Sequence, residues 1–173
     1  YRRMDGCAAV NRRRRSQGLA TRNASDGPLM SRTHWATPDY ADLSCHDNHV
    51  HGLSIREGPH GTGELVLDLD FILEWLPAAE RFSFRLAPAT LVFHDLTDLT
   101  VSLEYGHLGA AIGPFSVGEV SREVHVFTTG HSTYRWHIQV NWPEGALSFL
   151  ASGFTQDLRA APRHSSSQCL PPE

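Results

Sequence analysis

Residues 63–71 read GELVLDLDF, and in this stretch apolar and polar side chains alternate. Every second residue from Leu65 to Phe71 is leucine or phenylalanine, whereas Asp68 and Asp70 lie between them. Successive side chains of a β-strand point to opposite faces of the sheet, so a period of two predicts a strand. We expect one face of this strand to be buried and the other to be largely polar.

The same alternation recurs along the chain in short segments that are bounded by turn residues. In 142–145 (WPEG) a glycine follows two residues after a proline, which is good turn chemistry and lets the chain return antiparallel. We therefore expect an all-β fold, an antiparallel sandwich or open barrel of about eight short strands. A turn of helix is expected only at 71–78, and 107–115 reads as a Gly-rich loop. The strand segments are 49–57, 63–71, 81–87, 90–94, 99–105, 119–127 and 132–142, with a return around Leu147 and Phe149.

Charge is distributed unevenly along the chain. Residues 1–32 contain eight of the fifteen basic residues and two of the nineteen acids, a balance of +6, whereas the rest has a balance of −10. The first 32 residues are polar and without periodicity, which predicts a disordered Arg-rich extension. A β domain is expected over 33–160 and a frayed Pro- and Ser-rich tail over 161–173.

Three interpretations of the extension remain open. The chain begins with Tyr1, and Met30 precedes the first recognisable structure, so translation from too early a start is the first. The second is a targeting peptide containing arginine and serine. The third is an arm that binds nucleic acid phosphates through residues 11–15, which is the only route to nucleic acid that we expect.

The remaining composition points to a cytoplasmic protein without a membrane partner. The three cysteines are odd in number and far apart, and the start shows no apolar secretory core. No apolar run approaches the roughly 18 residues of a membrane span. A Gly-rich phosphate loop, a nucleophile elbow and a CxxC pair are all absent from the sequence. We therefore lean towards a protein without catalytic activity.

Residues 45–52, CHDNHVHG, are the strongest candidate for a metal site. On a strand that begins near His49, the imidazoles of His49 and His51 share one face, and His46 or Asp47 would arrive from the preceding turn. Such imidazoles suit Zn, Ni, Cu or Fe, so the possible cofactor is a divalent transition metal. His94, at the end of another strand, is a possible further ligand. The alternative is that Asp47 and its neighbours only shape a turn.

A second candidate is the carboxylate group formed by Asp68, Asp70 and Glu74. Asp68 and Asp70 should lie about 6.5 to 7 Å apart on one strand face, a spacing compatible with acid and base chemistry if both are buried. The commoner situation is a solvated strand face, which would serve as a binding face for a partner protein.

Two further groups have competing interpretations. Tyr134, Trp136 and Trp142 form either a stacking platform or part of the core, and the core is favoured because Ile138 and Val140 occupy the same face. Cys45 beside His46 would be reactive only as a thiolate. Arg85, Arg122 and Arg135 are expected to be solvated charges on outer faces.

The stretches HDNHVHG, ELVLDLDFILEW, APATLVFHDLTDL and SGFTQDLR resemble an uncharacterised family of small bacterial all-β proteins. The resemblance covers about residues 44–160 and implies the fold, but no activity and no site residue. The opening HD followed by two hydrophobic strands is also similar to small immunity proteins that neutralise bacterial toxins. This second likeness covers only about the first third of the domain and implies binding to a protein.

These observations favour a small cytoplasmic β domain that has no catalytic activity and binds a basic protein partner. One form of such binding would be an immunity-like role. An acidic surface speeds and steers association with a basic one. The alternative is a metal-binding protein or metal-dependent enzyme that uses His46, Asp47, His49 and His51. The oligomeric state is left open.

Overall fold

The computed structural model describes residues 32–77, 82–106 and 112–171. The chain divides into two units, Tyr1–Arg32 and Thr33–Glu173. Apart from Arg32, the predicted disordered extension lies outside the described residues. Antiparallel strands are the main regular structure of the second unit, which confirms the predicted all-β fold. None of the helices among the described residues is long and apolar enough to cross a membrane.

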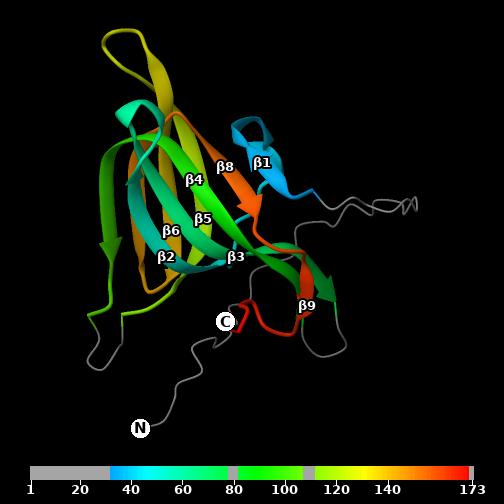
Figure 1. Ribbon diagram of the computed structural model, residues 1–173. Helices are drawn as coiled ribbons and strands as arrows, with labels where there is room; N and C mark the ends of the chain where they lie inside the picture. The colour runs from blue at the N-terminus through cyan, green and yellow to red at the C-terminus, as the bar shows by residue number, and fades with distance from the viewer. Residues whose placement is uncertain (1–31, 78–81, 107–111, 172–173) are drawn as a thin grey trace. The chain divides into compact units, whose positions relative to one another are not determined.

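Nine strands and two short 3-10 helices make up the described part of the second unit (Figure 1). In chain order these are β1 (His34–Ala36), η1 (Thr37–Asp42), β2 (His49–Glu57), η2 (Pro59–Gly61), β3 (Gly63–Pro77), β4 (Phe82–Leu103), β5 (Phe115–Val126), β6 (Ser132–Trp142), β7 (Gly145–Ala151), β8 (Gly153–Leu158) and β9 (Arg163–Ser165).

Two strands are much longer than the sequence suggests. β3 has 15 residues and β4 has 22, because neighbouring predicted segments join without a break. The helical turn predicted at 71–78 is wrong: the chain stays extended to Pro77 and pairs with β4 as far as Phe82. Pairing with a long neighbouring strand outweighs the weak local helical pattern.

The strands close into a barrel. Hydrogen bonding runs from β2 through β3, β4, β7, β6 and β5 and returns to β2. The last contact is short, since only His49 and Val50 are in register with Ser116 and Phe115. Of the two predicted architectures, a sandwich and an open barrel, the structure has the barrel, which is closed by a short seam at the start of β2.

β4 serves two parts of the barrel because it changes direction. Its first part pairs with β3 and β8, and its last part pairs with β7. Asp95 and Asp98 lie at the register shifts on either side of this change of partner, with φ of 56° and 52°, a backbone region that short polar side chains tolerate better than most. The bend lets one strand contribute to both sides of the core.

The alternating face of β3 forms the centre of the core, as the sequence predicts. Leu65, Leu67 and Leu69 are at most 1% exposed. Trp136 on β6 is fully buried, packs edge-to-face against Phe93, and donates its indole N–H to the carbonyl of Ala151 at 3.1 Å. The core interpretation therefore holds for Trp136. It fails for Trp142, which is 52% exposed because β6 there runs beyond the packed interior.

η1 covers one end of the core through Tyr40. The Tyr40 ring lies 5.6 Å from the Trp136 ring, and its hydroxyl donates to the Val120 carbonyl at 2.9 Å. The guanidinium of Arg122 lies over the Tyr40 and Tyr134 rings at 4.2 and 4.4 Å. The prediction that Arg122 is a solvated charge is wrong, because the negative faces of these rings attract the cation.

The segment after β8 is not frayed as predicted. β9 pairs with Phe84–Leu86 of β4, and Leu170 is buried against Ile72, Phe84 and Leu86. These residues form a second apolar cluster on the outer face of the β3–β4 hairpin. Composition suggests a frayed tail because the segment has no periodicity, whereas the apolar outer face that it covers is visible only in the folded hairpin.

Replacing Gln156 by methionine should leave the free energy of unfolding unchanged or raise it. Gln156 is fully buried, and neither atom of its amide has a hydrogen-bond partner among the described residues. A buried polar atom without a partner costs about 1–3 kcal/mol, and methionine keeps the shape without the polar atoms. Urea denaturation of the two proteins measures the difference.

The matched control is Asn48→Leu. The Asn48 side-chain oxygen accepts the N–H of Ile72 at 3.1 Å, so its loss should lower the free energy of unfolding by about 1–3 kcal/mol. If Gln156→Met lowers the free energy of unfolding as much as Asn48→Leu does, the Gln156 amide must make hydrogen bonds in the folded protein.

Candidate functional site

The stretch CHDNHVHG begins at the barrel seam. The N–H of Asp47 donates to the carbonyl of Val117 at 2.8 Å, and the N–H of Val117 donates to the carbonyl of Asn48 at 3.0 Å. Asp47 has a φ of 60°, and its side chain accepts bonds from Asn141 at 2.7 Å and Gln168 at 3.2 Å. The turn interpretation of Asp47 is supported by these bonds.

His51 is the extra residue of a β-bulge. Val50 is in register with Leu69 and Gly52 with Asp68, which leaves His51 without a register partner on β3. Bulges of this kind re-aim a side chain. Nε2 of His51 donates to Oδ2 of Asp70 at 2.8 Å. The structure therefore joins a residue from the predicted histidine group to one from the predicted carboxylate group.

Asp70 is buried and 2% exposed, so its carboxylate depends on its partners. The second of these is the backbone N–H of Leu170, which donates to the same oxygen at 2.7 Å. The hydrogen bond to Asp70 raises the pKa of His51, and burial only partly opposes this effect. The two residues form an oriented acid–base pair whose imidazole is about one-third exposed, at 34%.

His49 lies next to this pair but has different chemistry. Its ring packs edge-to-face on the His51 ring, with 4.8 Å between the centroids. Burial lowers the pKa of His49, and the neighbouring His51 lowers it further. The expectation that His49 and His51 share a face is correct, and the neutral form of His49 is favoured.

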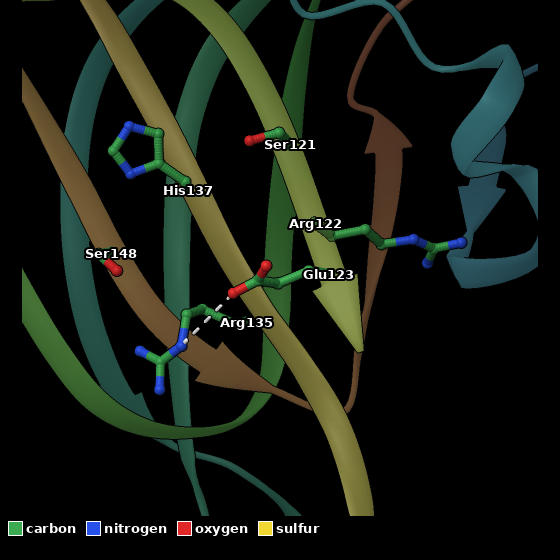
Figure 2. A pocket seen from close by; sticks show the side chains of 6 residues that line it. All are labelled: Ser121, Arg122, Glu123, Arg135, His137 and Ser148. Atoms are coloured by element: carbon green, nitrogen blue, oxygen red, sulfur yellow. Dashed lines mark ion pairs between the residues drawn. The ribbon is translucent and has the colours of Figure 1, made fainter. Parts of the chain in front are cut away.

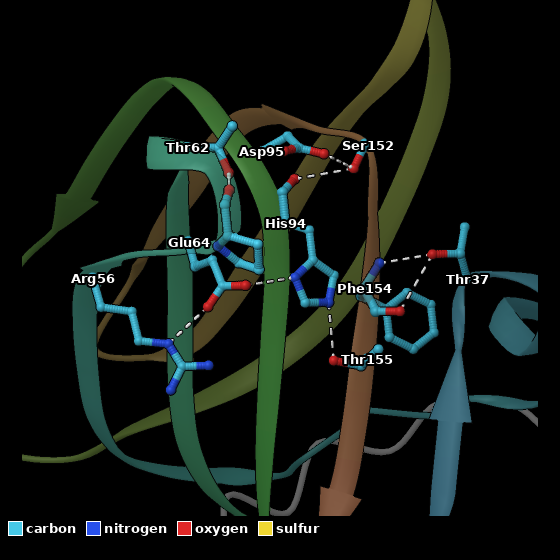
Figure 3. A network of polar contacts seen from close by, with 10 residues as sticks. Thr37, Arg56, Thr62, Glu64, His94, Asp95, Ser152, Phe154 and Thr155 are labelled. Atoms are coloured by element: carbon cyan, nitrogen blue, oxygen red, sulfur yellow. Dashed lines mark hydrogen bonds and ion pairs between the residues drawn. The ribbon is translucent and has the colours of Figure 1, made fainter.

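His46 and His94 are engaged elsewhere. Nδ1 of His46 donates to the Gly118 carbonyl at 2.7 Å. Figure 3 shows His94 between Glu64 and Thr155, at 2.8 Å from the carboxylate and 3.0 Å from the hydroxyl. The partner residue Glu64 is six positions from Asp70 along β3, or about 20 Å by strand rise. His94 is therefore remote from His51.

The Glu64 carboxylate holds a network on the outer face of the barrel. It accepts hydrogen bonds from Arg56 at 2.7 Å and from His94, so its charge is shared between two donors. The hydrogen bond from Arg56 is the main reason that the pKa of Glu64 is lowered. Because all its members are satisfied by neighbours, this network is best explained as structural.

Metal binding has no assembled site in the described ranges 32–77, 82–106 and 112–171, where no group of three histidine, cysteine or acidic residues is arranged to hold an ion. Two pairs of the predicted ligands lie close together: the ring centroids of His49 and His51 are 4.8 Å apart, and Nε2 of His46 lies 3.6 Å from Oδ2 of Asp47. Ligation by the Nε2 atom of His51 would require its bond to Asp70 to break. The divalent transition metal stays a prediction.

The predicted binding face of Asp68, Asp70 and Glu74 is not a continuous exposed surface. Asp70 is buried, and Asp68 forms an ion pair with Arg159. Glu74 is exposed and in register with Arg85. The sequence could not show this, because the residues that neutralise Asp68 and Asp70 come from β2 and from the C-terminal segment.

A polar pocket of about 340 Å³ lies over β5, β6 and β7 (Figure 2). In this pocket His137 is in register with Ser121 on one side and Ser148 on the other. Arg135 and Glu123 form an ion pair at 4.0 Å beside them. Within the described residues no hydrogen bond joins His137 to either serine, so this row lacks the contact that would activate a nucleophile.

A group of side chains lies where β4 and β6 end, and we name it the rim surface. It consists of Glu104, Tyr105, Trp142 and Glu144. The Trp142 and Tyr105 rings meet edge-to-face with 6.3 Å between centroids. The N–H of Glu104 donates to the Glu144 carbonyl at 2.9 Å, which keeps these two exposed acids on adjacent segments. Among the described residues neither carboxylate has an ion pair. Sequence reasoning missed this surface because it assigned Trp142 to the core.

The idea of a reactive Cys45 thiolate is wrong. Cys45 is buried in the main core, and burial raises the pKa of its thiol to about 12. A thiol in such surroundings is protonated and inert at neutral pH.

Comparison of the chain with protein-family models, with curated proteins and with solved structures finds no match in any of the three. The resemblances of the sequence to a bacterial all-β family and to immunity proteins therefore stay predictions. The site has to be interpreted from its own geometry.

An Asp70→Asn variant should lower the free energy of unfolding by about 1–3 kcal/mol, more at about pH 6 than at about pH 9. The pKa of His51 is raised in the folded protein, so its contribution is complete below the ordinary value of 6.5 and is lost as the pH rises through the raised value. Denaturation at both pH values measures this. Asp98→Asn, an exposed acid at a φ that asparagine tolerates, is the control. Equal losses at both pH values would contradict the assignment.

Proposed function

We propose that the unit Thr33–Glu173 is a non-catalytic binding domain for a basic protein partner, and that the rim surface makes the contact. The observation that carries the proposal is an exposed tryptophan that shares the rim surface with two exposed acids. A tryptophan face attracts arginine and lysine side chains, and carboxylates beside it add charge attraction. Tryptophan is also one of the residue types enriched among the residues that contribute most to binding at protein interfaces.

The charge of the unit supports a basic partner. Residues 33–173 carry seven arginines and seventeen acids. Several of these arginines are already occupied, as in the pairs Arg56–Glu64 and Arg159–Asp68 and in Arg122 over its aromatic rings. The remaining negative charge is available to steer a basic surface towards the domain.

The likeness to small immunity proteins points to the same class of function. Cytoplasmic localisation and an immunity-like role belong to this proposal and rest on the sequence alone.

The test is a titration of the full chain with a synthetic peptide of alternating arginine and serine. Binding is monitored through the NMR signal of the Trp142 indole N–H. We expect saturable binding that shifts this signal. The double variant Glu104→Gln/Glu144→Gln should bind roughly tenfold more weakly, since two exposed ion pairs of about 0.7 kcal/mol each amount to that factor. Trp142→Ala should weaken binding by a similar factor.

The control is Glu57→Gln/Glu119→Gln, which removes the same charge from exposed acids outside the rim surface. It should leave the affinity within about twofold of the original. Equal weakening in both double variants would mean that only net charge matters, and the rim surface would then be abandoned as the contact. A peptide that does not bind would refute the proposal.

A further inference from the structure

A second pocket, independent of the rim surface, lies on the outer face of β3 and β4 beneath the C-terminal segment. It has a volume of about 330 Å³, at the lower end of the range for small-molecule sites. His51, Asp68 and Asp70 line it from the barrel, and Arg159 and Arg163 line it from the C-terminal segment. Pockets of this kind combine apolar walls with a few convergent polar groups.

The polar side chains on the barrel side of the pocket are held in place by hydrogen bonds. Asp70 is buried and orients His51 through Nε2, which leaves Nδ1 as the ring atom without a hydrogen bond among the described residues. The Leu170 N–H, bound to the same carboxylate, fixes the C-terminal segment over the pocket. The imidazole is therefore held in one orientation by a buried carboxylate.

The charges in the pocket leave a surplus cation. Asp68 is neutralised by Arg159, and Asp70 by His51 when the imidazole is protonated. Arg163 then remains, and in the described part of the chain it has no ion pair. One positive charge matches one negative charge on a ligand, whereas a doubly charged ligand would meet the repulsion of Asp68 and Asp70.

The rest of the pocket wall is apolar, so a matching ligand should also have an apolar group. Pro88, Ala160, Leu170 and Pro171 line the pocket beside the charged groups. A ligand that fills it would place an apolar group against these side chains and its charge towards Arg163. A guanidinium matches the two oxygens of a carboxylate in a bidentate manner.

We propose that this pocket binds a small organic carboxylate with an apolar body, its carboxylate held by Arg163 and His51. The groups that face His51 are His49 on β2, Asp68 and Asp70 on β3, and Arg159 and Arg163 of the C-terminal segment. Protonated His51 completes the positive charge of the site. Affinity is therefore highest at low pH and falls as the pH rises through the pKa of His51, which the bond to Asp70 raises.

The probe is benzoate, titrated into the full chain by calorimetry at about pH 6 and about pH 9. We expect saturable binding that is at least about tenfold tighter at the lower pH. Benzamide, which has the same shape without the charge, should bind at least about tenfold more weakly than benzoate at the lower pH. Phenyl phosphate, which is largely a dianion above about pH 7, tests the charge argument at about pH 8, where it should bind more weakly than benzoate.

Arg163→Gln should weaken benzoate binding by at least about tenfold. Arg163 is exposed and its loss spares the core, so this variant is expected to fold. Arg135→Gln, in the pocket of Figure 2, is the matched control and should bind like the original protein. His51→Gln should remove the pH dependence.

Three results would overturn the proposal: no saturable binding of benzoate at either pH, equal affinity for benzamide, or unchanged affinity in Arg163→Gln. None of them bears on the rim surface, whose test uses a basic peptide and different residues.

Discussion

The closure between β2 and β5 is the contact on which the rest of the structure depends. Only His49 and Val50 pair in register with β5, and Asp47 and Asn48 extend the seam through bonds with Val117. Without this seam the sheet would have two more free edges, and its leucine-rich face would be open to water. The stretch CHDNHVHG, which the sequence suggests as a metal site, therefore has a structural role in closing the barrel.

Closing the barrel at this point also determines what the histidines can do. The bulge beside Val50 re-aims His51 onto Asp70, while His49 remains beside it with a lowered pKa. The same region therefore combines a turn, a seam and an oriented acid–base pair. A pocket with a charged floor exists there only because the C-terminal segment returns over it.

The two proposed sites use opposite charge. The rim surface offers acids and an exposed tryptophan at one end of β6, and the pocket under the C-terminal segment offers Arg163 and His51. Such separation is possible because the strands of a barrel present different residues along their outer faces. A domain with excess negative charge can still bind an anion where local pairing neutralises Asp68 and Asp70.

The sequence by itself determined the fold class and the inward face of the strands, because period-two alternation reports burial directly, as Leu65, Leu67 and Leu69 illustrate. It also drew attention to His51, Asp68 and Asp70 as separate candidates. Only the tertiary structure decided that these three meet in one pocket, that Asp70 is buried and that Trp142 is exposed. The reason is physical. Pairing between β2 and β3 brings His51 to Asp70, and the return of the chain over an apolar outer face joins residues a hundred positions apart, as in the bond from Leu170 to Asp70.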